Sequence, residues 1–328
     1  MRISVIISNF NGARFLPKLL DSLRAQTLAP AELFVVDRES HDASRDILSA
    51  FSGIRCLSHP AAAGLVSGYA AGARAATGDA FFFANEDLWL DSLALERLSL
   101  ALNADGDIAA ADPWQWSYDG AQWVHGAVRF IPARWDLASP CPLFGARFTE
   151  EAAEGAPTAF ASAGAFLIRR KAFDDAGGWD ESFFLDFEDV DLGIRLWQRG
   201  WRSVSVPTAR VYHHVNAANV HVLPGTREPV SRRRYISARS NRAMVAWKHF
   251  SPWAIPAATL QGPVEFLNNL RRGRFRQALW DVRADLDVAR RLPAARAYRA
   301  ANAVLRRRRP GEAFFAAPEF SVATGVRR

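Results

Sequence analysis

The first hundred residues alternate short apolar segments with segments whose apolar side chains recur at helical spacing. Residues 3–7, 33–36 and 80–84 are apolar runs of strand length. Between them, residues 15–23 and 42–51 place leucine, isoleucine or phenylalanine every three or four positions. Strands that alternate with helices are typical of a parallel sheet with helices on both faces. The sequence therefore predicts an α/β fold with a Rossmann-like, mostly parallel sheet flanked by helices.

Polar side chains follow each of these three predicted strands. Asn9 and Asn11 come after the first, Asp37 ends the second, and Asn85 and Asp87 follow the third. Each residue alone is typical of a turn or a helix cap. In open parallel sheets, however, ligands bind beyond the carboxyl ends of the strands. The recurrence at three strand ends therefore predicts one shared binding site.

An acidic segment occupies residues 180–191. A helix is predicted to begin near Glu188, which places Glu188, Asp189 and Asp191 in its first turn. Carboxylates in a first turn interact favourably with the helix dipole, so acidic capping is one interpretation. The other is that these carboxylates do chemistry. The residues themselves leave both open.

Charge is divided unevenly along the chain. Residues 227–328 hold 22 Lys and Arg against 7 Asp and Glu, whereas residues 1–226 hold 19 against 27. Within the basic part, residues 275–289 repeat apolar side chains every three or four positions among arginines, as an amphipathic helix does. Pro293 is predicted to interrupt this helix. Its apolar stripe fits either an anionic membrane surface or packing against the rest of the protein or a second subunit.

Two further features concern the setting of the protein. No window offers about 18 uncharged apolar residues, as a membrane-spanning helix requires. Cys56 and Cys141 are the only cysteines, which fits a reducing compartment. We expect a cytoplasmic protein, held peripherally at the inner face of the cell membrane.

Taken in order along the chain, several motifs resemble family-2 glycosyltransferases of the GT-A fold, in a rhamnosyltransferase-like branch. The matching segments are VIISNFNG (5–12), VVDRESHDAS (35–44), AATGDAFFFANED (75–87), the segment from GAFLIRR to QRGW (164–201), ARVYHH (209–214) and SARSNR (237–242). The resemblance implies a GT-A nucleotide-sugar-binding and catalytic domain over residues 1–225. Residues 226–328 would form a basic, mainly helical C-terminal region in contact with membrane.

The resemblance also assigns roles to residues on the donor side. The residues expected to bind the nucleotide are Ser8, Asn9, Asn11, Asp37, Ser40, Asn85 and Glu86. Asp87 and His213 would hold Mg²⁺ or Mn²⁺, since hard carboxylate oxygens suit these ions; His214 is the alternative to its neighbour. Arg38 and Glu39 stand where many relatives have Asn-Gly, a departure that bears on the choice of base or sugar.

On the acceptor side, Asp189 matches the family's catalytic base, and Trp179, Asp180 and Glu188 would face the acceptor. A divalent ion stabilises the charge that develops on a departing diphosphate, and a carboxylate removes the proton of the attacking hydroxyl. Attack opposite the leaving group then inverts the anomeric configuration. The resemblance implies a dTDP- or UDP-linked donor, rhamnose first, and a glycan or lipid-linked acceptor in cell-surface polysaccharide synthesis.

Two other classes of protein remain as alternatives. A nucleic-acid-binding protein could use the basic C-terminal arm, but no binding motif is recognisable, and the acidic N-terminal part would repel phosphates. We therefore expect no nucleic-acid partner. A sugar-1-phosphate nucleotidyltransferase would carry a glycine-rich, basic loop after the first strand, which residues 8–12 do not resemble.

Overall fold

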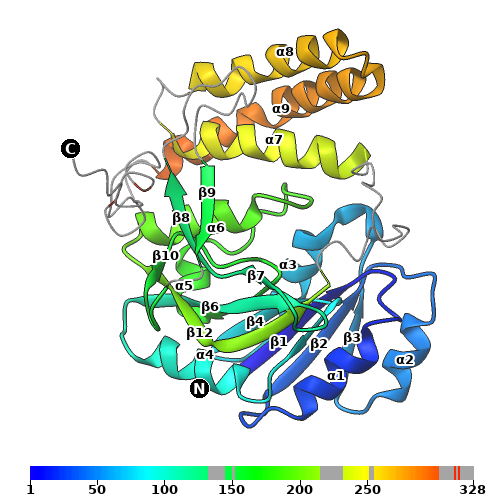
Figure 1. The fold of residues 1–328 in the computed structure, drawn as a ribbon, viewed down its shortest axis with the longest axis vertical. Coiled ribbons are helices and arrows are strands. Elements are labelled where there is room, and N and C mark those ends of the chain that lie inside the picture. Colours follow the sequence, from blue (N-terminus) through cyan, green and yellow to red (C-terminus); the bar gives the residue numbers. More distant parts are fainter. Residues whose placement is uncertain are drawn as a thin grey trace.

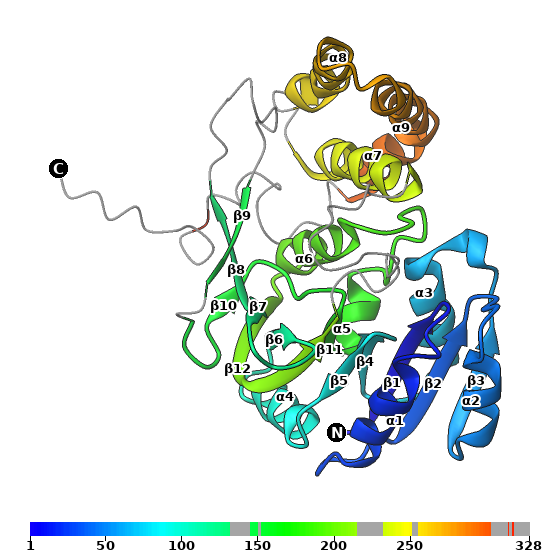
Figure 2. The same ribbon diagram turned by 45° about the vertical axis from the view of Figure 1, so that its right-hand side comes forward.

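The computed structural model describes residues 1–131, 145–149, 152–214, 232–250 and 255–302, together with Phe314 and Ala317. Within these residues, ten strands form one large sheet with helices on both faces, and three long helices stand at one end (Figures 1 and 2). The first part of the chain thus has the predicted α/β architecture, and the described part of the C-terminal region is helical.

The elements have the following bounds. The strands are β1 (Ile3–Asn9), β2 (Glu32–Asp37), β3 (Ile54–Ser58), β4 (Ala80–Asn85), β5 (Leu88–Leu90), β6 (Ile108–Ser117), β7 (Trp123–His125), β8 (Ala127–Ile131), β9 (Gly145–Thr149), β10 (Pro157–Thr158), β11 (Ala165–Arg169) and β12 (Arg202–His213). The helices are α1 (Leu16–Arg24), α2 (Ser44–Ala50), the 3-10 turn η1 (Ala61–Ala63), α3 (Leu65–Ala75), α4 (Ala94–Asn103), α5 (Arg170–Asp175), α6 (Glu188–Gln198), α7 (Arg232–His249), α8 (Ile255–Arg271) and α9 (Phe275–Asn302).

The sheet has the strand order β10-β12-β6-β11-β4-β1-β2-β3, with β5 and β7 attached at β12 and β6. The block β4-β1-β2-β3 is parallel, as the alternation of strands and helices predicts. Beyond it the sheet is mixed, because β11 runs antiparallel to both β4 and β6. The chain between β6 and β11 contains strands β7 to β10 and no described crossover helix, and a connection without a crossover permits antiparallel return.

The register of the parallel block brings distant polar residues together. Asn9 lies opposite Asp37 on β2, and Ser8 lies opposite Asn85 on β4. Neighbouring strands are about 4.8 Å apart, so the ends of β2, β1 and β4 fall within roughly 10 Å. The three predicted strand ends therefore meet at one edge of the sheet.

Two hydrophobic layers cover the faces of the sheet, because side chains alternate along each strand. Ile6 and Phe83 point to the layer that includes α3 and α6. Val5, Ile7 and Phe82 point to the other layer, against α1 and α4. Burial on both faces explains why β1 and β4 are continuous apolar runs instead of alternating ones.

The C-terminal helices form a separate layer over α6. Helix α7 packs against α6 on one side and against α8 and α9 on the other (Figure 2). Pro293 lies inside α9 and does not interrupt it, contrary to the prediction. Proline has no N–H, so the carbonyl of Ala289 lacks its hydrogen bond within the helix. Ala289 and Pro293 are both exposed, and water can bind that carbonyl instead. The predicted boundary between residues 225 and 226 lies outside the described residues.

Residues 114–125 form a hairpin, in which β6 and β7 flank the Tyr118-Asp119-Gly120 turn. Through the parts of the chain that the structure describes, no helix combines the length and the apolar character needed to cross a bilayer.

Candidate active site

A hydrogen-bonded cluster holds Asp37 at the end of β2. Asn9 Nδ2 donates to Asp37 Oδ1 at 2.8 Å and the Ser40 hydroxyl donates to the same oxygen at 2.5 Å. Arg45 Nε lies 3.1 Å from Oδ2, and the backbone N–H of Asn11 donates to Ser40 Oγ. Burial alone would raise the pKa of Asp37, but these bonds hold its pKa below the ordinary value. The cluster brings four of the predicted nucleotide residues together around a fixed carboxylate.

Ser8 and the Arg38–Glu39 pair border this cluster. The Ser8 hydroxyl is buried and lies 3.4 Å from the carbonyl of Leu65, so it faces α3. Glu39 has a φ of 53°, a left-handed conformation that the glycine common in the resemblance would adopt without strain. Arg38 is 9% exposed, and among the described residues Nε has no hydrogen-bond acceptor. A buried cation at this edge suits an anionic ligand. The sequence showed only that Arg38 differs from the residue common in relatives and did not show that it is buried.

Asp87 and His213 meet at the next position along the same edge. His213 Nε2 lies 3.0 Å from Asp87 Oδ1, although 126 residues separate them. The pairing of β12 with β5 sets Leu88 opposite His213 and so carries the imidazole to the end of β4. Asn85 Nδ2 lies 3.5 Å from the same imidazole nitrogen, and its Oδ1 accepts a bond from the Tyr69 hydroxyl.

The pair fits a divalent cation. The amide oxygen of Gln115 lies 2.9 Å from His213 Nδ1 and can accept a hydrogen bond from it, which would leave Nε2 available to bind a cation beside Asp87. Two such donor atoms about 3 Å apart match neighbouring ligands of an octahedral ion with bonds of roughly 2.1 Å. No cluster of three His, Cys, Asp or Glu is found within the described ranges. Diphosphate oxygens and water would therefore complete the coordination, as is usual for Mg²⁺.

His214, the alternative ligand, packs differently. Its ring lies against Phe15 and Tyr118, with ring centroids 4.9 Å and 5.9 Å apart. Its backbone N–H, and not its imidazole, contacts Asp87, donating a hydrogen bond to the Asp87 carbonyl. The geometry favours His213.

Glu86 lies beside this pair. Its burial and the neighbouring charge of Asp87 raise its pKa to about 7, and the nearby Arg38 opposes that rise. A carboxyl that keeps its proton up to neutral pH can donate a hydrogen bond, which is one way to contact a ligand oxygen.

Asp189 lies at the start of α6 and lines a cavity of about 350 Å³. Its oxygens accept bonds from the backbone N–H groups of Ala163 at 3.3 Å and Val190 at 2.8 Å. Despite these bonds, burial raises the pKa of Asp189 to about 6. Glu188, Asn85 and His213 line the same cavity. A carboxylate with a pKa near neutrality, in a cavity that His213 also lines, has the properties of a general base.

Glu188 is the second carboxylate of this cavity. Only 5% of its surface is exposed, and burial together with the adjacent Asp189 raises its pKa well above the ordinary range. The two neighbours therefore do not both ionise readily, as expected for like charges in one site.

A strained turn sets the direction of Asp189. Asp186 and Phe187 both have a φ of 69°, a left-handed conformation that side-chain-bearing residues rarely adopt. Helix α7 holds the turn: Asn241 Nδ2 donates to the carbonyls of Leu185 and Asp186 at 3.0 Å and 2.8 Å, and the Ser237 hydroxyl donates to Leu185.

Arg234 adds an ion pair to this clamp, with a nitrogen 3.2 Å from each carboxylate oxygen of Asp186. Sequence reasoning did not assign roles to Arg234, Ser237 or Asn241, although the SARSNR segment was part of the resemblance. The signal was the spacing of Ser237 and Asn241, which places two polar side chains on one face of a helix.

Trp179 and Asp180, predicted to face the acceptor, do not line the cavity of Asp189. The Trp179 ring is 6% exposed and stacks on Tyr69 at 5.8 Å between centroids, next to a second cavity of about 410 Å³. Asp180 accepts a bond from Lys248 Nζ at 2.8 Å. Both side chains are engaged in contacts within the protein, and acceptor binding by them stays a prediction.

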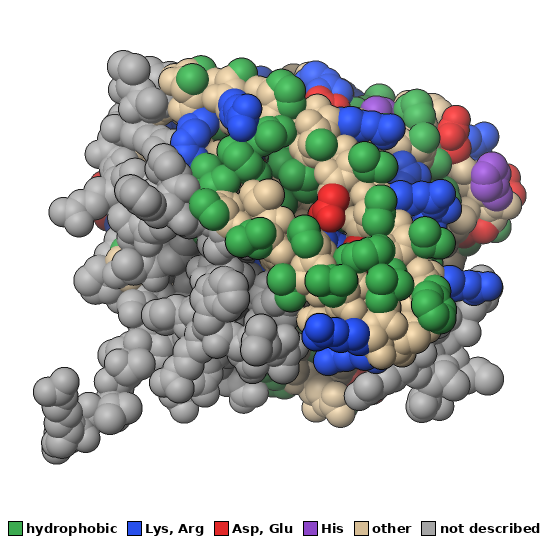
Figure 3. All heavy atoms as spheres, turned by 90° about the horizontal axis from the view of Figure 1, so that it is seen from above, with side chains coloured by type: hydrophobic (Ala, Val, Ile, Leu, Met, Phe, Trp, Pro, Cys, Tyr) green, Lys and Arg blue, Asp and Glu red, His purple; other side chains and the backbone are tan. Residues whose placement is uncertain are grey.

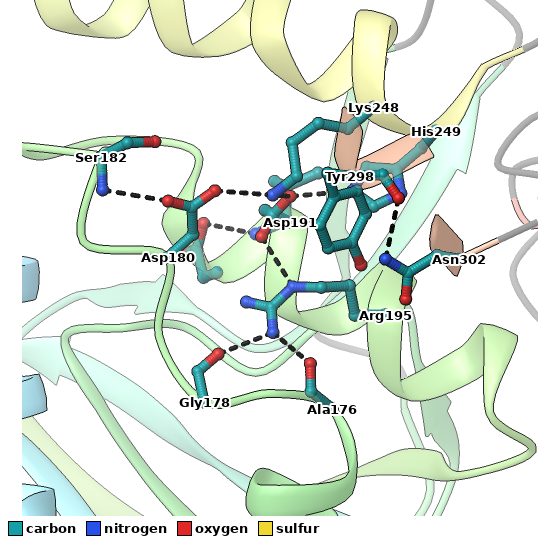
Figure 4. Close-up of polar contacts among 12 residues, drawn as sticks. Ala176, Gly178, Asp180, Ser182, Asp191, Arg195, Lys248, His249, Tyr298 and Asn302 are labelled. Carbon is teal, nitrogen blue, oxygen red and sulfur yellow. Dashed lines mark hydrogen bonds and ion pairs between the residues drawn. The ribbon is translucent and has the colours of Figure 1, made fainter. Parts of the chain in front are cut away.

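Lys248 also belongs to a buried charge network around Asp191 (Figure 4). Arg195 Nε and His249 Nε2 each lie 2.8 Å from the Asp191 carboxylate, and Lys248 Nζ lies 2.5 Å from it. Asp191 is fully buried, and the surrounding cations hold its pKa well below the ordinary range despite its burial. The network joins α6 to α7, so the C-terminal helices are attached to the helix that carries Asp189.

Comparison with known proteins places this site in a family. The model of glycosyl transferase family 2 matches residues 4–177, and that of glycosyl transferase family group 2 matches residues 144–222. The N-acetylglucosaminyl-diphospho-decaprenol L-rhamnosyltransferase of Mycobacterium tuberculosis is 37% identical over 117 residues, 35% of each chain. An uncharacterized glycosyltransferase of Nostoc is 39% identical over 95 residues, 27% of this chain and 29% of that one. These matches span about a third of the relatives' own lengths.

Solved structures show the same fold. GalNAc-T7, crystallised with UDP, GalNAc and Mn²⁺, aligns over 77% of this chain and 49% of its own with a TM-score of 0.60 and 18% identity. TarS of S. aureus, residues 1–349 with UDP, aligns over 92% of this chain and 89% of its own with a TM-score of 0.51 and 15% identity. With a family model over more than half its length and a GT-A architecture, the chain belongs to glycosyl transferase family 2.

Proposed function

We propose that this glycosyltransferase moves a sugar, rhamnose first among the candidates, from a nucleoside-diphosphate donor to a lipid-linked glycan acceptor. The observation that carries the proposal is that the predicted base and a predicted metal ligand lie at the same cavity. Asp189 and His213 line one cavity, and His213 contacts Asp87. The choice of rhamnose and of a lipid-linked acceptor is supported by the name of the mycobacterial relative.

At the donor side, the cluster around Asp37 would bind the base and ribose, with Asn9 and Ser40 keeping the carboxylate ionised and oriented. Asp87 and His213 would hold Mg²⁺ or Mn²⁺ against the diphosphate. Such an ion stabilises the negative charge of the leaving group when it is bound. The Gln115 contact keeps the His213 imidazole turned toward Asp87.

At the acceptor side, Asp189 would take the proton of the attacking hydroxyl. The hydroxyl oxygen forms the new bond to the anomeric carbon as the bond to the diphosphate breaks, and the diphosphate leaves with the electron pair. A single displacement of this kind inverts the anomeric centre and needs no covalent enzyme intermediate. Glu188, protonated beside Asp189, would donate a hydrogen bond to the acceptor.

The test is transfer to a defined acceptor. The protein is incubated with dTDP-rhamnose, UDP-linked sugars or GDP-mannose, each with and without Mn²⁺, and with a synthetic N-acetylglucosaminyl-diphospho-lipid. We expect product with dTDP-rhamnose and Mn²⁺, and NMR of its anomeric proton should show inversion. A product with retained configuration would contradict the single displacement, and transfer unaffected by chelation of the metal would contradict the role of Asp87 and His213.

A further inference from the structure

Exposed apolar side chains gather on two neighbouring helices. Across the part of the chain that the structure describes, every exposed large hydrophobic residue except Met1 and Leu100 lies on α8 or α9. They are Leu260, Leu267 and Leu270 on α8, and Phe275, Leu279, Val282 and Leu286 on α9. Folded monomers rarely expose so many large apolar side chains in one region, and such patches mark interaction sites.

The patch has the form of two amphipathic helix faces. Along α9 the exposed residues follow at intervals of four, three and four, which keeps them on one side of the helix. The opposite side of α9 is buried through Ala278, Asp281 and Ala284. The apolar stripe therefore does not pack onto the catalytic part of the molecule, and contact with a membrane or with a second subunit are the interpretations that remain.

Basic side chains border this patch. Arg271, Arg272, Arg274 and Arg276 are exposed where α8 turns into α9, and Arg283 and Arg290 are exposed farther along α9. Figure 3 shows hydrophobic side chains gathered on this end of the molecule, with Lys and Arg at their edges. Apolar side chains flanked by arginines match an anionic bilayer, whose headgroups attract cations and whose acyl region takes up apolar groups.

We propose that the exposed faces of α8 and α9 form the surface by which the protein docks on anionic phospholipid membranes. This surface consists of the seven apolar residues and the arginines around them. The proposal rests on the proposed function, since an enzyme with a lipid-linked acceptor works at a membrane. Helix α7 lies between it and α6, so docking would hold the helix that carries Asp189 at a fixed distance from the lipid headgroups (Figure 2).

The experiment measures binding and does not depend on turnover. The full-length protein is sedimented with vesicles of phosphatidylcholine alone or with 30% phosphatidylglycerol (about a third of the lipid), at low and high salt. We expect binding only to the anionic vesicles, weakened by salt because screening shortens the reach of the arginines. Replacing Leu279 and Leu286 by Gln should weaken binding roughly 10-fold for each leucine removed from the bilayer.

Leu100→Gln is the matched control. Leu100 is 65% exposed, like Leu279 at 64%, but lies on α4, away from the C-terminal helices. This variant should bind vesicles as the unaltered protein does. Equal binding by the Leu279/Leu286 variant would overturn the proposal.

A second outcome would also overturn it. If light scattering shows a dimer that the Leu279/Leu286 variant loses, while no vesicles bind, the face is an interface between copies of this chain. Failure of the transfer assay, by contrast, leaves the vesicle result unchanged, so the two proposals can fail separately.

Discussion

Replacing Asn241 tests whether the C-terminal helices set the direction of Asp189, the proposed base. Asn241 is fully buried, and its amide nitrogen donates to the carbonyls of Leu185 and Asp186. Leucine has the same number and branching of side-chain heavy atoms but no polar group, so Asn241→Leu fills the site and removes both of these hydrogen bonds. It also removes the contact with Ser237 Oγ and the bond that Asn241 Oδ1 accepts from Arg291. The change lies in α7 and does not touch the donor pocket.

The magnitude follows from the turn that Asn241 holds. A buried carbonyl left without its donor costs about 1–3 kcal/mol. The left-handed conformations at Asp186 and Phe187 cost about 1–3 kcal/mol each, so the turn relaxes when its clamp is lost. A displacement of about 1 Å at a catalytic group lowers turnover by roughly 100-fold. We expect kcat to fall between about 10-fold and 100-fold, and the free energy of unfolding to fall by about 2 kcal/mol.

The assay separates kcat from the KM for the donor, and urea unfolding supplies the stability. The KM should hardly change, because β1, β2 and β4 position the donor residues independently of α7. Asn269→Leu is the matched control: Asn269 Nδ2 donates to Asp281 at 2.8 Å and lies 3.4 Å from the Tyr235 hydroxyl, away from the turn. It should lose stability and keep kcat. Equal losses of kcat in both variants would refute the positioning argument.

Four further outcomes follow from the site. Asp189→Asn should lower turnover by at least about 100-fold while donor binding, measured by thermal shift, is retained. In the unaltered protein kcat/KM should fall as the pH drops through about 6, because a protonated Asp189 cannot accept a proton. Asp87→Ala should abolish the Mn²⁺-dependent part of the thermal shift given by the nucleotide-sugar. Asp191→Asn should destabilise the fold by about 3–5 kcal/mol in urea unfolding, since it removes the carboxylate that pairs with the buried Arg195 and leaves Lys248 with Asp180 alone.

The raised pKa of Asp189 also makes the free energy of unfolding depend on pH. Its folded pKa lies above the ordinary 3.8, so the stability linked to its protonation is present below about pH 4 and is lost as the pH rises through about 6. Asparagine does not ionise, so Asp189→Asn removes the destabilisation that ionised Asp189 causes at higher pH. The variant should unfold at higher urea than the unaltered protein at pH 8, and the difference should shrink at pH 5.

The parallel half of the fold was predictable because its information is local. Apolar runs and helical periodicity give β1, α1, β2 and β4, and the rule for parallel sheets then places their polar ends together. The observed register of Asn9 with Asp37 and of Ser8 with Asn85 agrees with this. The antiparallel course of β11 was not predictable, because an apolar segment of five residues carries no signal of direction.

Contacts between distant segments account for the rest. Nothing near Asn241 in the sequence indicates that its amide meets the carbonyl of Asp186, which lies 55 residues earlier. The pattern of Leu279 and Leu286 is likewise the same whether the stripe is packed or exposed. Trp179 was assigned to the acceptor by resemblance alone, and its place in the sequence gives no sign that its ring packs among Tyr69, Phe83 and Phe173.

The acidic N-terminal part and the basic C-terminal part of the chain do not move independently, because α6 is attached to both. Asp189 and Asp191 are two residues apart, so they project about 200° apart around the helix. One faces the cavity, and the other enters the network of Lys248 and His249 on α7. A shift of α7 would therefore move the helix that carries the proposed base. A membrane that held α8 and α9, as proposed, would act on that same helix through α7 and would thereby link docking to the geometry of the proposed transfer.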